Sequence, residues 1–153
     1  MITSRVRAFS AVAALVAFAI VTGLGAASVA EAAAQKAALH EVTTLPSCAT
    51  ASVTGAEHGF AILNETEASE GIIAEVSLKD GASDHNYTVT LIQCQGTTEV
   101  KSTPLGTLHT NIEGNGNLHG TAVEKTSTPA ADHAFVTLNG GTGQLFATAK
   151  VPI

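Results

Sequence analysis

Apolar and polar residues alternate with a period of two along much of the chain after residue 56. The clearest segment is Gly71–Lys79, in which one face carries Ile72, Ala74, Val76 and Leu78, and the other carries Glu75, Ser77 and Lys79. Successive side chains of a β-strand point to opposite faces of the sheet, so this pattern predicts a strand with one buried face. Asn86–Cys94 shows the same alternation, with Tyr87, Val89 and Leu91 together.

Further strands are predicted between loops rich in Gly, Ser, Thr, Asn and Asp. They are Leu39–Leu45, which is weak, Glu57–Leu63 with His58, Phe60 and Ile62 on one face, and His133–Asn139 paired with Gly143–Val151, where Leu145, Ala147, Ala149 and Val151 face inward. Helical spacing does not recur among them. Short strands separated by turn signals predict an all-β fold, an antiparallel β-sandwich of about seven or eight strands or a partly open barrel.

A tight hairpin is predicted over Pro104–Glu124, because Gly and Asn accept positive φ at Gly114–Gly116 between two alternating arms. The register that puts both apolar sets on one face pairs Ile112 with Leu118 and Leu108 with Ala122. It also places His109 and His119 diagonally on the opposite face, roughly 7 to 8 Å apart.

The first thirty-four residues have the pattern of a secretory signal peptide. Two arginines precede the apolar run from Ala8 to Leu24, and small residues at 32–34 form a cleavage signal. We expect cleavage after Ala34, with Ala30 as an alternative. The remaining chain divides into a tail with a weak first strand at 35–50 and one β domain at 51–153, which predicts a secreted, extracellular protein.

The charge of the exported part argues against several partners. From residue 35 onward there are five lysines, no arginine and twelve carboxylates, a formal charge of 5 − 12 = −7. Nucleic acid and anionic lipid both require clustered cations, so we expect neither as a partner. No later apolar run is long enough to span a bilayer.

Cys48 and Cys94 are the only cysteines, and both lie in the exported part. In an oxidising compartment such a pair is expected to form a disulfide. The alternatives are a two-cysteine metal site and a free reactive thiol. An immunoglobulin-type bridge would pack on a tryptophan, and the chain has none.

Histidines suggest an alternative function as a metal-binding or redox protein. The candidate ligands are His58, His109 and His119, because neutral imidazole is a common zinc or copper ligand. His58-Gly59-Phe60 resembles the HGFHVH strand of copper/zinc superoxide dismutases. The positions of that family's copper ligands hold Ala61 and Leu63 here, so the resemblance does not extend to the copper site.

Aromatic residues are scarce, and two of them suggest a binding patch. Phe135 and Phe146 fall on the faces opposite the predicted core faces of neighbouring strands, where they would form a small exposed apolar patch. The interpretation that we favour over this patch is a second core layer, in which both faces of these strands are covered.

No arrangement of residues supports an enzyme. The chain has no G-x-S-x-G nucleophile elbow and no defensible Ser, His and Asp triad. We therefore expect no catalytic residue and no cofactor, and the leading hypothesis is a non-enzymatic module that binds a protein, a surface or a small apolar ligand.

Most of residues 50 to 151 resemble a known group at the level of fold. The resemblance lies in the strand Gly71–Lys79, the strand start at 86–89, the arms at 105–108 and 116–118, and the ending at 134–136 and 146–148. In these features the chain is similar to the small secreted immunoglobulin-like sandwich proteins of actinobacteria. The resemblance implies a Greek-key sandwich outside the cell and carries over no catalytic residue.

Overall fold

The computed structural model describes residues 34–50, 52–66, 71–120, 122–141 and 143–153, and within these ranges it contains ten β-strands and no helix. The strands are β1 (Gln35–Val42), β2 (Glu57–Glu65), β3 (Gly71–Leu78), β4 (Asn86–Gln95), β5 (Thr98–His109), β6 (Gly116–His119), β7 (Val123–Glu124), β8 (His133–Asn139), β9 (Leu145–Thr148) and β10 (Val151–Pro152). Apart from Ala34, the predicted signal peptide lies outside the described residues. No helix in the described part is long and apolar enough to cross a membrane.

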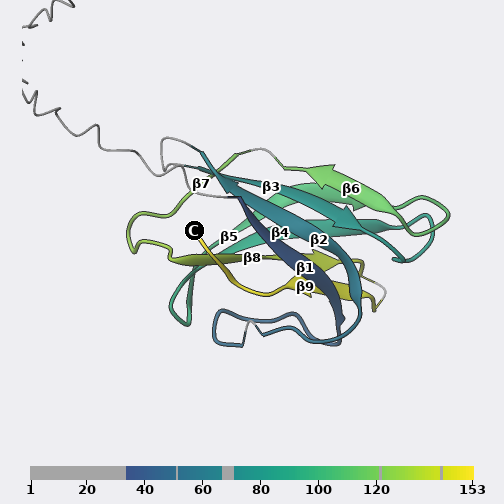
Figure 1. The fold of residues 1–153 in the computed structure, drawn as a ribbon, viewed down its shortest axis with the longest axis horizontal. Helices are drawn as coiled ribbons and strands as arrows, with labels where there is room; N and C mark the ends of the chain where they lie inside the picture. Colours follow the sequence, from purple (N-terminus) through teal and green to yellow (C-terminus); the bar gives the residue numbers. More distant parts are fainter. Residues whose placement is uncertain (1–33, 51, 67–70, 121, 142) are drawn as a thin grey trace, which may run out of the picture.

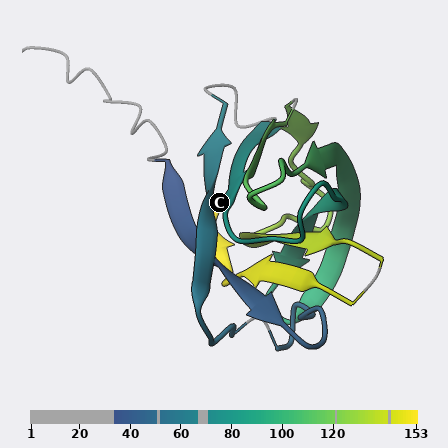
Figure 2. The same ribbon diagram turned by 90° about the vertical axis from the view of Figure 1, so that its right-hand side faces the viewer.

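All the strands belong to one antiparallel sheet that curls nearly into a barrel (Figures 1 and 2). The strand order is β5-β4-β8-β9-β1-β2-β3-β6, with β10 beside β8 and β7 beside β3. The edge strands β5 and β6 approach each other without forming a ladder in the described part. There the side chain of Leu118 lies near Gly106 and that of Leu105 near Gly120. Side-chain packing therefore closes the sheet where backbone hydrogen bonds do not.

The predicted all-β antiparallel fold is confirmed. The finer prediction of a sandwich is not confirmed, because the ladders join the strands into one continuous sheet. The inner faces predicted for Gly71–Lys79 and Asn86–Cys94 are correct, since all seven of their apolar side chains are buried. These two strands have apolar residues mainly at alternate positions, which is why their sequences determine the buried face.

The interior is filled by side chains from the inner faces of the strands. The largest buried rings in it are Tyr87 and Phe146, whose centroids are 5.6 Å apart. The Tyr87 hydroxyl accepts a hydrogen bond from Ala82 N at 2.8 Å and donates one to Gln144 Oε1 at 2.6 Å. Tyr87 thus joins the core to the loops after β3 and β8 at one end of the barrel.

Gln93 performs a similar role at the opposite end of β4. Its side chain is fully buried, Nε2 donates to Glu124 O at 2.9 Å, and Oε1 accepts from Thr126 N at 2.8 Å. Both halves of the amide are therefore satisfied by backbone groups, which a buried polar group requires. Through these two hydrogen bonds, Gln93 holds β7 and the segment that follows it against β4.

The weak first strand predicted within residues 35–50 is present, but it begins at Gln35, where a tail was predicted, and it is an interior strand of the sheet. β1 begins at Gln35 and lies between β9 and β2, with Ala37 and Leu39 buried. Alanine has low strand propensity, but strand preference depends mostly on neighbours and burial. Hydrogen bonding on both sides and two buried side chains outweigh that propensity here, so residues 35–50 form part of the same domain as the rest of the sheet.

The predicted hairpin pairing over Pro104–Glu124 is wrong. β5 pairs with β4, and β6 pairs with β3 in the register Val76 opposite Leu118. The turn itself is present, with Gly114 at φ 78° and its N–H donating to Asn111 O. The chain leaves the sheet at Thr110, whose buried hydroxyl donates to Ala82 O at 2.6 Å, and this leaves Ile112 exposed.

Candidate binding face

The outer surface of β1, β2, β3 and β6 carries two rows of side chains that cross four strands. The ladders place them as Lys36, Ile62, Glu75 and His119 in one row and Ala38, Phe60, Ser77 and Asn117 in the other. These residues alternate with buried ones such as Ala61, Leu63 and Ala74. We call this surface the outer face. It is mixed in character, with apolar, hydroxyl, amide and charged groups within reach of one another.

A groove of about 280 Å³ runs across the outer face. Its lining comprises Phe60, Glu75, Val76, Ser77, Asn117, Leu118 and His119. Ser77 is the smallest of these side chains and lies between Phe60 on β2 and Asn117 on β6. A small residue flanked by larger ones on both neighbouring strands accounts for the hollow over β3.

Two contacts hold the larger side chains of the groove in place. Lys36 Nζ lies over the Phe60 ring, 4.1 Å from its centroid, which is within cation–π range. His119 Nδ1 lies 3.2 Å from Glu75 Oε1, and both side chains are substantially exposed. Each contact is individually weak at the surface, but each favours particular rotamers of the side chains that line the groove, Phe60 in one case and Glu75 and His119 in the other.

Phe60 differs from the other aromatic residues in its exposure. Tyr87, Phe135 and Phe146 are completely buried, whereas Phe60 is half-buried. Because Phe9 and Phe18 lie outside the described residues, Phe60 is the one aromatic side chain in the described part that reaches the surface. The sequence of β2 does not show that Phe60 lies on the surface. Phe60 and Ile62 on one face and Ala61 and Leu63 on the other are all apolar, so either face could have been the buried one.

The three candidate metal ligands lie in different surroundings. His58 packs against Phe146 with ring centroids 5.4 Å apart, and its Nε2 is 3.9 Å from Glu41. His109 contacts Asp84 at 3.2 Å and Asn86 at 2.9 Å. Because β6 pairs with β3, His119 lies beside Glu75 and not diagonal to His109 as predicted. No group of three or more His, Cys, Asp or Glu residues in the described ranges is arranged to hold a metal ion.

The possible patch of Phe135 and Phe146 is absent, because both side chains are completely buried. Phe146 belongs to the barrel core, and Phe135 packs on the other side of the sheet with Ile92 and the two cysteines. The favoured interpretation, in which both faces of these strands are covered, is the arrangement observed. The inward set predicted for the last strand also changes, since Phe146 is in the core and Ala149 is exposed.

The predicted disulfide between Cys48 and Cys94 is confirmed, with the two Cα atoms 5.7 Å apart. It connects the segment after β1 to the end of β4, and both cysteines are at most 1% exposed. A disulfide indicates a non-reducing environment. Because a thiol must reach the sulfur to exchange with it, burial is typical of a structural bridge and does not favour a redox role.

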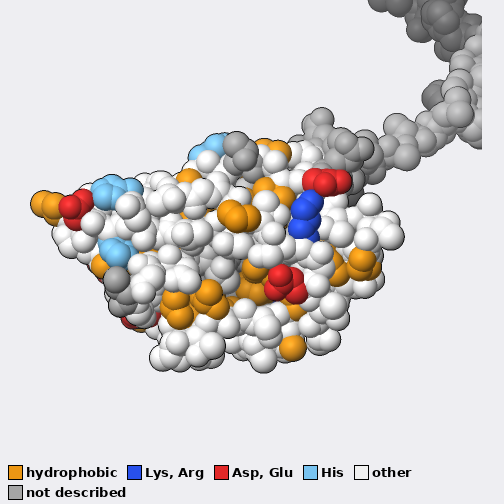
Figure 3. Space-filling model, turned by 180° about the vertical axis from the view of Figure 1, so that it is seen from behind, with side chains coloured by type: hydrophobic (Ala, Val, Ile, Leu, Met, Phe, Trp, Pro, Cys, Tyr) orange, Lys and Arg blue, Asp and Glu red, His pale blue; other side chains and the backbone are white. Residues whose placement is uncertain are grey.

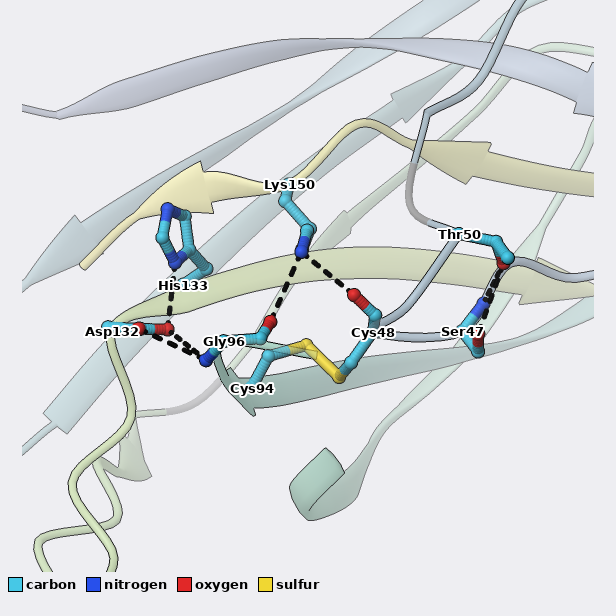
Figure 4. Close-up of a disulfide and its surroundings, with 8 residues drawn as sticks. All are labelled: Ser47, Cys48, Thr50, Cys94, Gly96, Asp132, His133 and Lys150. Carbon is cyan, nitrogen blue, oxygen red and sulfur yellow. Dashed lines mark hydrogen bonds and ion pairs between the residues drawn. A yellow bond between two sulfur atoms is a disulfide. The ribbon is translucent and has the colours of Figure 1, made fainter. Parts of the chain in front are cut away.

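Polar contacts surround the disulfide (Figure 4). Lys150 Nζ donates to Cys48 O at 2.8 Å and to Gly96 O at 3.2 Å. The Asp132 carboxylate accepts from Gly96 N at 3.1 Å and from His133 Nδ1 at 2.7 Å. The hydrogen bond with His133, followed by that from Gly96, holds the pKa of Asp132 below its ordinary value of 3.8. These contacts join four chain segments around the bridge.

A second hollow, of about 340 Å³, lies against the segment between β1 and β2. Its lining is mostly hydroxyl and aliphatic: Glu41, Val42, Thr43, Thr44, Leu45, Pro46, Thr50, Ser52, Val53 and Thr54. Among the described residues its lining has no aromatic ring and a single ionisable side chain, so it offers fewer kinds of contact than the groove on the outer face.

Charged side chains are few over the surface as a whole. Only 13% of the residues are Asp, Glu, Lys or Arg. On the face drawn in Figure 3, uncharged polar groups and backbone make up most of the surface, with hydrophobic side chains scattered among them. Such a surface offers few ionic contacts to a ligand.

Comparison with known protein families, with curated proteins and with solved structures found no match to this chain. The sequence and the geometry of the outer face are therefore the basis for the functional argument.

Proposed function

We propose that this chain is an exported, non-enzymatic binding module that contacts a partner through the groove on its outer face. The observation that carries the proposal is the position of Phe60, the surface aromatic residue, in a hollow of about 280 Å³ next to amide, hydroxyl and carboxylate groups. Aromatic side chains contribute much of the contact area in recognition sites, and a few polar groups add specificity.

Export is supported by two independent features. The predicted signal peptide comes from the pattern of residues 1–34, and the disulfide fits a non-reducing compartment. Cleavage after Ala34 would leave Gln35, the first residue of β1, at the N-terminus. The resemblance to secreted immunoglobulin-like proteins of actinobacteria remains a prediction.

Binding is a better explanation of the groove than catalysis. Glu75, His119 and Ser77 are residue types found in hydrolase triads, and all three line the groove. However, His119 is 72% exposed and no hydrogen bond joins it to Ser77 within the described part. An activated nucleophile requires a base within hydrogen-bond reach and a site shielded from water. Neither condition is met here.

Co-sedimentation with insoluble cell-surface and extracellular material tests the proposed function. We expect wild-type protein with an intact disulfide to be depleted from the supernatant, and Phe60→Asp to remain there because the charge disrupts the apolar wall of the groove. Ile112→Asp is the matched control, since Ile112 is an exposed apolar residue outside the groove, 80% accessible. We expect it to behave as wild type.

Two results would contradict this proposal. Equal depletion of Phe60→Asp and wild type would show that the groove is not the binding site. Hydrolysis of an activated ester that disappears in Ser77→Ala would show that the groove is catalytic.

A further inference from the structure

One face of the Phe60 ring is positioned to border the groove. Lys36 lies over the ring at 4.1 Å from its centroid and comes from β1, whereas the groove lies over β3 and β6 on the other side of β2. The cation therefore covers one face of the ring. The opposite ring face is left for a ligand with an apolar surface of similar size.

The polar groups around that ring face are varied. Ser77 has a hydroxyl and Asn117 an amide, and each can donate and accept hydrogen bonds. Glu75 Oε1 lies 3.2 Å from His119 Nδ1, so this carboxylate already has a partner on the protein. The register places Ser77 opposite Asn117 and Glu75 opposite His119, which brings all four groups to one side of Phe60.

We propose that the groove binds a neutral saccharide, with the C–H face of one sugar ring on Phe60 and its hydroxyls on Ser77, Asn117 and Glu75. This inference rests on the proposed function and names the ligand class for the same site. A sugar ring combines an apolar face with a rim of donors and acceptors, which is the combination that this lining complements. The volume of about 280 Å³ lies just below the usual range for ligand pockets, so it suits a ligand of one or two rings.

The negative charge of the protein favours the binding of neutral saccharides over acidic ones. The exported part carries a net charge of 5 − 12 = −7, and the only cation beside the groove, Lys36, is engaged over Phe60 within the described part. An acidic saccharide would be repelled at long range and would lack a free cationic partner. We therefore expect neutral saccharides to bind and uronic or sialic acids not to.

The test is a titration of isotope-labelled protein, with its disulfide intact, monitored by amide chemical shifts. The probes are neutral oligomers of β-linked glucose, N-acetylglucosamine and galactose and of α-linked mannose. We expect at least one of them to shift the amides of Ser77, Asn117 and His119. Phe60→Ala is expected to weaken that binding about five- to tenfold, as the loss of an aromatic contact predicts.

Asn117→Ala provides a second variant, because Asn117 is exposed on a short edge strand and its truncation leaves the core unchanged. We expect a similar loss of affinity for this variant and none for Ile112→Ala. The saccharide inference is overturned if no oligomer shifts the groove amides, or if Phe60→Ala and wild type bind equally. If only apolar peptides shift these amides, the outer face is a binding site but its ligand is not a saccharide. If Phe60→Asp still co-sediments like wild type, both the saccharide inference and the proposed binding function are contradicted.

Discussion

At the scale of single residues, buried polar groups organise this protein as much as apolar ones do. Gln93 and Thr110 are completely buried, and each is hydrogen-bonded to backbone groups of a segment far away in sequence. A buried polar group is stable only when it is bonded, so each of these side chains specifies one position for the segment that it contacts.

Replacing Gln93 with Leu tests this role. The change leaves Thr126 N–H without its partner and removes one of the bonds to Glu124 O, which Lys101 also contacts. We expect a loss of about 1–3 kcal/mol in the free energy of unfolding, measured by urea denaturation. Gln95→Leu at the exposed end of the same strand is the control. Equal stability of the two variants would show that the buried amide contributes nothing specific.

Asp132 makes stability depend on pH in a defined direction. Its pKa is lowered in the folded protein, first by the hydrogen bond with His133, so the folded state favours the ionised carboxylate. Such a group stabilises the fold above its ordinary pKa, and the contribution is lost as pH falls through the lowered folded value. The effect is expected to be small, because Asp132 is exposed to solvent.

Melting temperatures of wild type and Asp132→Asn, measured from about pH 7 down to about pH 2, check this prediction. At pH values above 3.8, the ordinary pKa of an aspartate, the wild type is expected to melt at a higher temperature than Asp132→Asn. The difference in melting temperature is expected to shrink as the pH falls below that value. Glu99→Gln, at an exposed position in β5, is the control. A difference that stays constant with pH would mean that Asp132 acts through packing and not through its charge.

At the scale of elements, the segment between β1 and β2 depends on one covalent link and a small second core. Cys48 and Cys94, together with Ile92 and Phe135, form a buried cluster outside the barrel interior. Four residues are too few to hold a long irregular segment by apolar burial alone, since ordering each residue costs about 1–2 kcal/mol. The disulfide reduces that cost by restricting the unfolded chain.

Reduction of Cys48–Cys94 is expected to lower stability by about 4 kcal/mol, from the loop-closure entropy of 46 residues of sequence separation. Urea denaturation of oxidised and reduced wild type measures the difference directly. We also expect the native disulfide to resist thiol reductants until urea unfolds the protein, because both sulfurs are buried. Reduction at the same rate in native and unfolded protein would contradict the structural role.

The whole molecule is a nearly closed barrel, and closure determines which surfaces can bind. An edge strand offers unpaired backbone groups to other chains, and proteins usually shield such edges. Here the edges β5 and β6 shield each other through Leu105 and Leu118. The interior is packed with side chains, so a ligand has to contact the outside, and the groove over β3 is where the described surface combines an aromatic ring with polar groups.

The sequence by itself determined the fold class, two of the buried faces and the disulfide. β3 and β4 have apolar residues mainly at alternate positions, so a period of two was sufficient to orient them. The disulfide followed from counting, because an exported chain with two cysteines has one possible intramolecular pair. These are local properties, or properties that do not depend on how the strands are arranged.

Only the tertiary structure decided which strands are neighbours, and the neighbours decided the site. Alternation specifies the face on which a side chain lies, but it does not specify the neighbouring strand. Backbone hydrogen bonds are the same for any sequence, so the sequence alone does not show that β6 pairs with β3 and not with β5. That choice separates His119 from His109 and places it with Glu75 beside Ser77. In β2, β8 and β9 both faces carry apolar residues, so the sequence alone could not show which face is buried. The curl of the sheet exposed Phe60 and enclosed Phe146, and the segment joined by the disulfide covered Phe135 on the other side.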